Sequence, residues 1–204
     1  MNIRLEQRTD YKEVEHLVRE SFWNIYRPGC TDHFIVHNLR HHPSYIKDLG
    51  YLIEEDDKII AYIAYSVGGV YIDGEKIIDA LNLGPVCVHP EYQKQGYGKK
   101  IIEFTLEKAK QMNFPFVIVI GDENYYCRFG FEFATNYDIH YSGVEKEDES
   151  PFFMIKVFDK DKVDAIAGIF TESEVFNINE EEFEEFDSKF PPKKKEKREG
   201  QLDF

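Results

Sequence analysis

The chain has 204 residues, 42% of them hydrophobic and 15% aromatic, which is enough apolar material for a folded core and excludes global disorder. The formal net charge of -14 repels nucleic acid and anionic membranes on average and favours cationic partners. The three cysteines, Cys30, Cys87 and Cys127, are odd in number and widely spaced, so we expect neither a disulfide framework nor a structural zinc site.

The beginning of the chain predicts a strand and two helices. Asn2 to Gln7 alternates weakly, as a strand does, and charged residues follow Met1 at once, so we expect no secretory signal. A helix is predicted from Tyr11 to about Trp23 and a second one from about Asp32 to Arg40. No apolar run is long enough to span a bilayer, and we expect a cytoplasmic protein.

A meander of strands follows. The expected strands are Tyr51 to Glu55, Lys58 to Val67, Val70 to Ile72 and Ile77 to Val88. Gly68 and Gly69 interrupt the second strand, and Asp73-Gly74 is a strong hairpin signal. Gly84-Pro85 breaks the last strand in its middle, which predicts a bulge because proline has no N–H for a ladder.

The rest of the pattern predicts a mixed sheet. A helix is expected from about Gly98 to Met112, and Phe116 to Ile120 has the uniformly apolar sequence of a strand buried on both faces. A short helix near Tyr125 to Arg128 and strands at Phe131 to Phe133 and Phe152 to Phe158 complete the series. The order of elements indicates an α/β, three-layer fold with helices on both faces of the sheet.

The composition changes near residue 159. We expect a main domain over 1–159 and an extension over 160–204. The acidic run Glu180 to Glu185, with Phe183 and Phe186, fits either a small amphipathic helix docked on the domain or a disordered segment. The Pro-Lys cluster Pro191 to Arg198 predicts a solvated tail.

The most informative stretch runs from Leu83 to Gly98. An apolar strand ends at Val88, and Gln93 to Gly98 opens an amphipathic helix. Glycines let the backbone approach a ligand, and the start of a helix carries partial positive charge, so this turn suits a diphosphate. Two other phosphate motifs fail, because a dinucleotide fingerprint needs glycine where Ile101 stands and a Walker A loop needs glycine where Gln93 stands.

This stretch resembles the acetyl-CoA motif of GCN5-related N-acetyltransferases (GNAT). The matching residues are Val-Cys-Val-His-Pro-Glu-Tyr-Gln-Lys-Gln-Gly-Tyr-Gly, 86–98, and Tyr126, separated by three residues from Gly130-Phe131, resembles the second landmark of the family. A bacterial subgroup of predicted acetyltransferases also carries Leu83-Gly84-Pro85 and the pattern of Gly121 to Phe131. The resemblance covers about residues 1–158 and implies a mostly antiparallel sheet, splayed at the cofactor site.

The resemblance implies acetyl-CoA as co-substrate and no metal. Backbone groups of the pre-loop strand would bind pantetheine, with the Val86 N–H polarising the thioester carbonyl, and the loop amides would bind the pyrophosphate. The cofactor-binding residues expected from this match are Val86, Cys87, Val88, Gln93, Lys94, Gln95, Gly96, Tyr97, Gly98 and Lys99.

Two catalytic residues are expected from the same match. Tyr126 stands at the position of the tyrosine that protonates the departing CoA thiolate, although it could instead be only a packing aromatic. Some members carry a glutamate base where Asn82 stands; an amide cannot act as a base but can orient a water. Asp79 or His89 could otherwise take the proton.

The histidines of the second predicted helix form a row. His33, His37 and His41 are spaced by four residues, which places them on one helix face. A metal site, a substrate-facing role and a solvated face all fit this spacing, and the solvated face is the interpretation that requires the fewest assumptions. Cys127, beside Tyr126, is expected to be a packing residue rather than an acyl carrier.

The function predicted is an acetyl-CoA-dependent N-acyltransferase that acetylates a primary amine by direct attack. The acceptor would be a small molecule or a peptide, with no nucleic acid or membrane partner, and a homodimer is left open. Two alternatives remain: a non-catalytic acyl-CoA sensor with the same fold, which Asn82 favours, and an interaction protein acting through the acidic extension.

Overall fold

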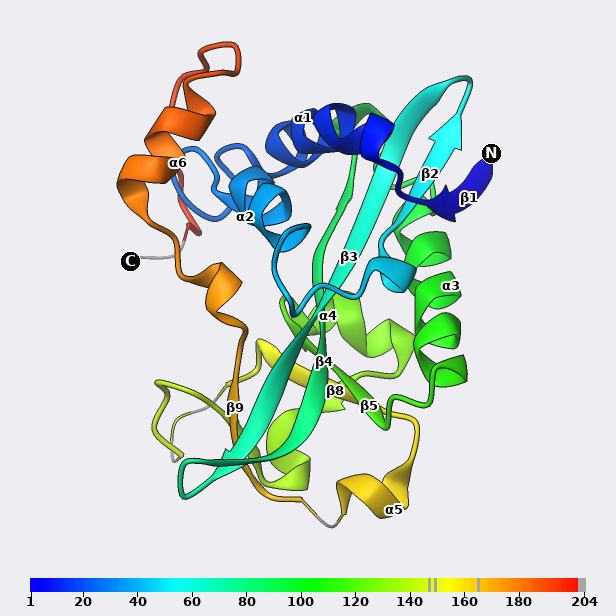
Figure 1. Cartoon of the computed structure of the whole chain (residues 1–204), viewed down its shortest axis with the longest axis vertical. Helices are drawn as coiled ribbons and strands as arrows, with labels where there is room; N and C mark the ends of the chain where they lie inside the picture. The colour runs from blue at the N-terminus through cyan, green and yellow to red at the C-terminus, as the bar shows by residue number, and fades with distance from the viewer. Residues whose placement is uncertain (147, 149, 165, 202–204) are drawn as a thin grey trace. The chain divides into compact units, whose positions relative to one another are not determined.

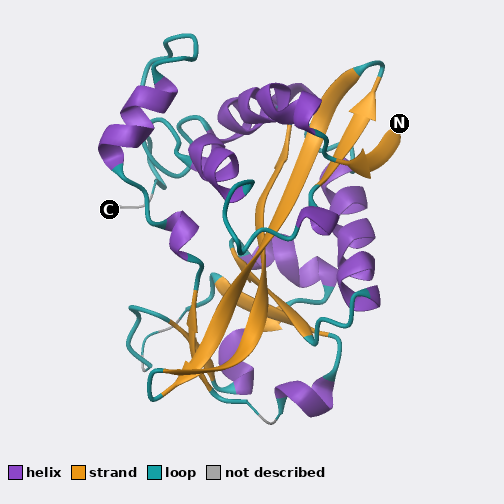
Figure 2. Ribbon diagram, in the orientation of Figure 1, coloured by secondary structure: helices purple, strands orange, loops and turns teal. Residues whose placement is uncertain are grey.

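The protein forms two compact units in its computed structural model, which describes residues 1–146, 148, 150–164 and 166–201 (Figure 1). Unit 1 comprises Met1–Ala64, Pro85–Ile101 and Glu174–Phe204. Unit 2 comprises Tyr65–Gly84 and Ile102–Ser173. Figure 2 shows both as mixtures of helix and strand, which confirms the prediction of a mixed α/β fold.

Unit 1 contains antiparallel strands at the beginning of the chain. β1 (Asn2–Leu5) pairs with β2 (Tyr51–Glu55), and β2 pairs with the first part of β3 (Lys58–Ile72). Positive φ angles at Asp56 and Asp57 form the tight turn between β2 and β3. The pairing order in this unit is therefore β1-β2-β3.

Helices α1 (Tyr11–Phe22) and α2 (Asp32–Leu39) are the first two α-helices of unit 1. Val14, Leu17 and Val18 recur at helical spacing on α1 and are all buried in one apolar cluster. Other helical segments of this unit include the 3-10 turns Arg8–Asp10, Lys47–Leu49, Pro90–Tyr92 and Glu174–Phe176 and the helix α6 (Glu180–Asp187).

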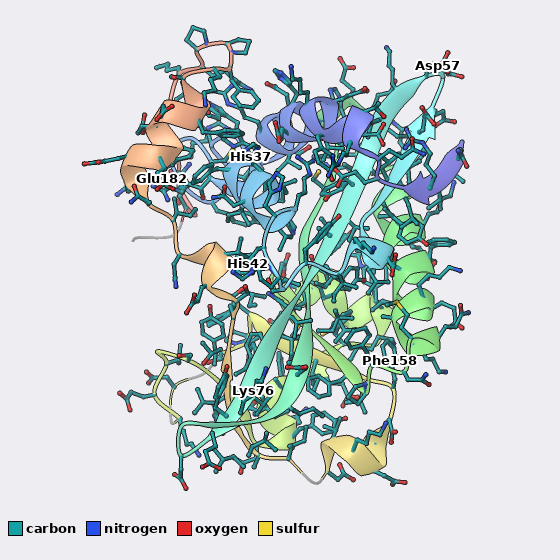
Figure 3. All side chains as sticks on the ribbon, viewed as in Figure 1. His37, His42, Asp57, Lys76, Phe158 and Glu182 are labelled. Carbon is teal, nitrogen blue, oxygen red and sulfur yellow. The ribbon has the colours of Figure 1, made fainter. Side chains whose placement is uncertain are left out.

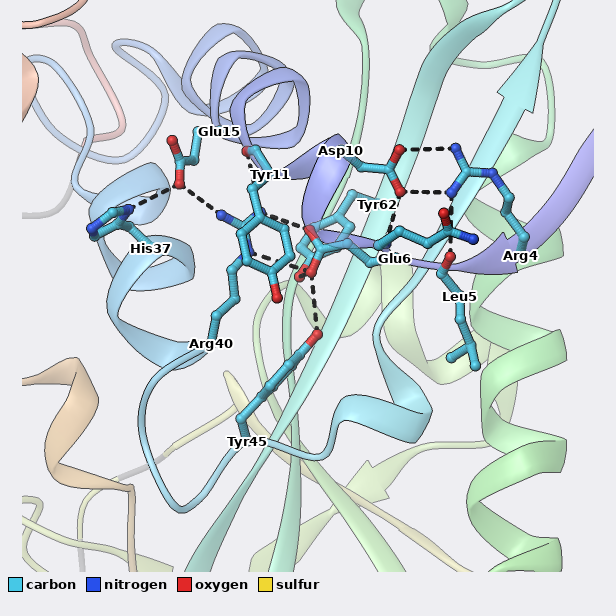
Figure 4. A network of polar contacts seen from close by, with 11 residues as sticks. Arg4, Leu5, Glu6, Asp10, Tyr11, Glu15, His37, Arg40, Tyr45 and Tyr62 are labelled. Carbon is cyan, nitrogen blue, oxygen red and sulfur yellow. Dashed lines mark hydrogen bonds and ion pairs between the residues drawn. The ribbon is translucent and has the colours of Figure 1, made fainter.

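A buried ionic network connects α1 with the residues that directly follow β1 and α2 (Figure 4). The Arg40 guanidinium lies 2.6 Å from a carboxylate oxygen of Glu6 and 2.6 Å from one of Glu15, and the side chains of these three residues are exposed by 1%, 2% and 9%. Tyr45 and Tyr62 donate hydrogen bonds to the Glu6 carboxylate at 3.3 and 3.4 Å. Each charge in this apolar setting therefore has an opposite charge or a donor beside it.

Within unit 1, helix α6 packs on α2 by its aromatic face. Phe183 and Phe186 are buried against Phe34 of α2, while acidic residues such as Glu182 face solvent (Figure 3). The docked amphipathic helix is therefore the correct one of the two readings of this run. Most residues of the Pro-Lys segment are exposed, as predicted for a solvated tail, and the Lys194 carbonyl accepts hydrogen bonds from Trp23 Nε1 and Asn24 Nδ2, both at 3.0 Å.

Unit 2 contains the larger part of the strands. Its pairing order is β3, β4 (Glu75–Val88), β5 (Phe116–Ile120), β8 (Phe153–Val157) and β6 (Glu132–Phe133). β9 (Gly168–Thr171) pairs antiparallel with β3 and parallel with β7 (Ile139–Tyr141). β5 lies between β4 and β8, as its apolar sequence predicts.

The helices of unit 2 are α3 (Tyr97–Gln111), whose first turn belongs to unit 1, α4 (Glu123–Tyr126) and α5 (Lys160–Val163). Two 3-10 segments, Cys127–Phe129 and Ala134–Tyr137, follow α4. The apolar cluster of unit 2 includes Phe116, Ile118, Phe153 and Phe170. No helix among the described residues is both long enough and apolar enough to cross a membrane.

The prediction that Gly68 and Gly69 interrupt a strand is wrong, because β3 is continuous from Lys58 to Ile72. Gly69 pairs with Thr171 of β9, and a Cβ on Gly68 would lie 2.6 Å from the Thr171 carbonyl oxygen. The glycines therefore allow a neighbouring strand to come close. β7, α5 and β9 have no counterpart in the predicted elements, and the division at residue 159 stays a prediction.

Candidate functional site

The strand before the glycine loop changes its pairing at Gly84. The parallel ladder of β4 with β5 runs from the Leu81–Val117 pair to the Leu83–Val119 pair within the described part of the chain. Gly84 follows with a φ of 155°, and Pro85 cannot donate a backbone hydrogen bond. The ladder thus ends where Gly84-Pro85 predicts a break.

The last residues of β4 lie in unit 1. Val86 and Val88 are half-buried and Cys87 is buried. Ser21 Oγ donates a hydrogen bond to the Val88 carbonyl at 3.2 Å, and the His89 N–H donates to the Ile60 carbonyl at 2.8 Å. Burial raises the pKa of Cys87 to about 12, so this thiol stays protonated and is no nucleophile at neutral pH.

The loop that follows has the backbone of an anion-binding turn. Gly96 has a φ of 89° and Lys94 a φ of 61°, and no heavy atom lies within 4 Å of the position a Gly96 Cβ would take. The 15-residue helix α3 begins at Tyr97, directly after this glycine. The first N–H groups of an α-helix have no intrahelical partner, so a turn of this kind suits an anion.

Side chains of the loop brace it from within. Gln93 Nε2 donates to the Val88 carbonyl and Gln95 Nε2 to the Glu91 carbonyl, both at 3.1 Å. The Tyr97 hydroxyl donates to the Glu55 carboxylate, and this bond raises the pKa of the Tyr97 phenol. The amide side chains of Gln93 and Gln95 are thus occupied by hydrogen bonds to the loop and to the end of the preceding strand.

Tyr126 lies in unit 2 at the end of α4. Its side chain is 9% exposed and packs edge-on against the rings of Tyr125 and Phe131, with centroids 5.1 and 5.7 Å away. A Cβ on Gly121 would lie 2.5 Å from the Tyr126 ring, so only glycine allows this placement. Asp122 begins α4 by accepting the Asn124 N–H at 2.9 Å.

Asn82, also in unit 2, is 2% exposed and has a carboxylate partner that sequence reasoning missed. Its Nδ2 donates to Glu172 Oε1 at 3.0 Å, and the Tyr141 hydroxyl donates to Glu172 Oε2 at 2.5 Å. Glu172 directly follows β9. No local pattern marks this residue, because its position depends on the pairing of β9 with β3.

The other proposed proton acceptors are placed differently. Asp79 has a side chain 59% exposed and forms an ion pair of 2.7 Å with Lys76, a residue labelled in Figure 3. His89 Nδ1 accepts the Glu91 N–H at 3.3 Å. Cys127 is an exposed free thiol, so the expectation that it packs inside is wrong.

The row of histidines does not form a uniform solvated face. His33 is fully buried, with Nε2 2.9 Å from Asp187 Oδ1 and Nδ1 3.5 Å from Cys30 Sγ. His37 Nδ1 lies 3.0 Å from Glu15 Oε1 (Figure 4). Among the described residues, no group of three or more His, Cys, Asp or Glu side chains is arranged to hold a metal ion.

Comparison with known proteins agrees with this geometry. Residues 2–134 match the family model described as an acetyltransferase (GNAT) domain. The chain is 27% identical over 180 residues to the uncharacterized N-acetyltransferase YhbS of Escherichia coli K12, covering 87% of this chain and 99% of that protein. Over half of the chain therefore lies within one family model.

Solved structures show the same fold. The crystal structure of Escherichia coli YhbS in complex with CoA superposes with a TM-score of 0.74 at 25% identity, covering 87% of this chain and 92% of that one. A GNAT family acetyltransferase from Brucella melitensis in complex with acetyl-CoA gives a TM-score of 0.69 at 24% identity, covering 86% and 97%. The chain therefore belongs to the GNAT acetyltransferase family, which confirms the predicted fold and the predicted acyltransferase class of enzyme.

Proposed function

We propose that this protein transfers the acetyl group of acetyl-CoA to a primary amine, by direct attack of the neutral amine on the thioester carbonyl. The observation that carries the proposal is the backbone conformation at Gly96. It has a left-handed φ of 89° and open space at its Cβ position, directly before the 15-residue helix α3. Backbone N–H groups and the helix dipole at such a turn attract a diphosphate, the charged part of CoA.

The proposed binding groups come from one continuous stretch of unit 1. The loop amides from Gln93 to Lys99 would bind the pyrophosphate, and Lys94 and Lys99 would add positive charge. Val86, Cys87 and Val88 would offer backbone groups to the pantetheine arm. Their support is the end of the β4–β5 ladder at Leu83, because a strand released from its neighbour has backbone groups to offer.

The proposed chemistry assigns Tyr126 as the acid that protonates the departing thiolate. A phenol can do this without carrying charge in the resting enzyme. Its support is the tight fit of the ring against Gly121, which holds a tyrosine in one orientation. Asn82 would orient the acceptor through its amide.

The experiment that tests the function has two parts. Calorimetric titration with acetyl-CoA measures binding, and a thiol reagent measures CoA release with a panel of polyamines, aminoglycosides, amino acids and peptides. Tight binding together with turnover of at least one primary amine supports the proposal. Tight binding without turnover of any amine would identify an acyl-CoA sensor instead, and absence of binding would leave neither function.

A further inference from the structure

Unit 2 contains a carboxylate, that of Glu172, whose two hydrogen-bond donors are neutral. Glu172 is partly buried, and its two oxygens accept hydrogen bonds from the neutral donors Asn82 Nδ2 and Tyr141 Oη. Among the residues that the structure describes, no Lys, Arg or His forms an ion pair with it. In contrast, the buried carboxylate Glu6 in unit 1 lies against Arg40. Removing a carboxylate partly from water without an opposite charge beside it costs free energy, so this arrangement calls for an explanation.

Asn82 supplies a second, independent observation. Its buried Oδ1 has no hydrogen-bond partner within the described chain. Turning the amide over does not remove the problem, since Oδ1 would then face the Glu172 carboxylate and Nδ2 would be the unsatisfied group. An acceptor atom and an uncompensated carboxylate therefore lie side by side, a pair that suits an ammonium group with several N–H donors.

The main chain brings these residues together. Gly69 of β3 pairs with Thr171 of β9, so Glu172 comes one residue after the last pair of that ladder. Phe170 is fully buried and stacks on Phe153 with ring centroids 5.5 Å apart, which holds β9 in place. The glutamate position is thus set by a packed strand rather than by a loop.

We infer that Glu172 is the general base of the reaction and that it recognises the acceptor as a protonated primary amine, with Asn82 Oδ1 accepting a second N–H of the same nitrogen. The inference rests on the proposed function and names both its substrate class and its missing base. It places the base directly after β9, with its carboxylate beside the Asn82 side chain of β4.

The proton balance of the step is complete. The ammonium gives one proton to a Glu172 oxygen, and the free electron pair of the nitrogen forms the bond to the thioester carbonyl carbon. The carbon–sulfur bond breaks, and the CoA thiolate takes a proton from Tyr126. The nitrogen loses a second proton as the amide forms, which replaces the one that Tyr126 gave, and Glu172 releases its proton to solvent.

The environment of Glu172 suits this role. Burial raises the pKa of its carboxyl above the ordinary value, while the Tyr141 and Asn82 donors oppose that rise. A carboxylate with a raised pKa is a stronger base than an exposed one, so it comes closer to an aliphatic amine with a pKa near 10.4. Tyr141 and Asn82 thereby tune the base as well as hold it.

The test compares Glu172→Gln with Glu174→Gln, a control that removes a nearby exposed carboxylate. The two nucleophiles are the most active aliphatic amine of the panel and hydroxylamine, whose nitrogen is already largely neutral at pH 7. We expect Glu172→Gln to slow the aliphatic amine about 100-fold, to leave hydroxylamine and acetyl-CoA affinity nearly unchanged, and to recover as the pH is raised. Glu174→Gln should match the wild type.

A second variant guards against a purely structural effect. Tyr141→Phe removes one donor from the carboxylate, which should raise the pKa of Glu172 and move the acidic limb of the pH–rate profile to higher pH. An equal loss with both nucleophiles, an unchanged rate in Glu172→Gln, or an unshifted limb in Tyr141→Phe overturns the inference. Those results with an active wild type leave the proposed function intact, whereas a wild type that acetylates no amine removes both.

Discussion

His33 on α2 and Asp187 at the end of α6 lie in contact, with Nε2 2.9 Å from Oδ1. Arg19 of α1 reaches the same carboxylate, with Nε 2.7 Å from Oδ1. Asp187 therefore joins three helices of unit 1 through one buried group of charges. The arrangement makes the attachment of α6 sensitive to pH.

Stability should fall in acid through His33. Burial, opposed by the Asp187 charge, lowers the pKa of His33 from 6.5 to about 4. Between pH 6.5 and 4, His33 is protonated in the unfolded chain but neutral in the folded chain. The stability linked to this residue is therefore complete above pH 6.5 and is lost as the pH falls toward 4. The slope is up to about 1.4 kcal/mol per pH unit. Chemical denaturation at several pH values measures it.

His33→Gln should flatten this dependence between pH 6.5 and 4. His41→Gln is the control, since His41 is exposed on the chain segment just after the same helix. Asp187 does not confuse the result, because its carboxyl has a lowered pKa and loses its stabilising effect only in more acid solution. Equal slopes in the His33→Gln variant and the wild type would contradict the assignment.

Gly96→Glu should abolish acetyl-CoA binding, because a carboxylate would then stand at the proposed pyrophosphate site. Gly74→Glu is a matched control: Gly74 has a φ of 84° against 89° for Gly96, and both have open space at the Cβ position. The backbone strain is therefore similar in the two variants, and only one affects the loop. Calorimetric titration with acetyl-CoA compares the affinities of the two variants. Retained binding by Gly96→Glu would show that the loop is not the phosphate site.

Tyr126→Phe should lower kcat about 100-fold, the usual contribution of a general acid, with little change in acetyl-CoA affinity. Tyr125→Phe is the control, because it removes the hydroxyl of the adjacent ring and keeps the packing of α4. Steady-state CoA release measures both. An unchanged kcat in Tyr126→Phe would leave this residue with a packing role only.

Phe186→Ala should lower the free energy of unfolding by about 3 kcal/mol, since Phe186 is buried and a cavity would replace its ring. Its ring lies 5.3 Å from that of Phe34 and 4.5 Å from that of His37. Phe133→Ala, at a 37% exposed position, should cost much less. Denaturation curves measure both variants, and an equal loss of stability in the two would contradict the docking of α6.

Elements with a strong local signal were predictable. The helical spacing of Val14, Leu17 and Val18 predicts α1, and the apolar run between Pro115 and Gly121 predicts β5 with both of its bounds. The loop from Gln93 to Gly98 was also readable, because it combines a strand end, glycines and a helix start within a few residues. Each of these depends on interactions between near neighbours in the chain.

Elements that depend on distant partners were not predictable. β9 has four residues, too few for a recognisable period, and it exists because Gly68 and Gly69 admit it beside β3. Cys127 and His33 were placed wrongly for the same reason, since their exposure depends on what other segments cover.

The sequence by itself determined the fold class and the glycine loop, because local periodicity and backbone chemistry specify them, and the resemblance of its motifs indicated the family. Only the tertiary structure decided that Glu172 lies against Asn82 and that Asp187 holds His33 and Arg19. Contacts between residues so far apart in the chain come from strand pairing and helix docking, and no local pattern encodes which side chains those will bring together.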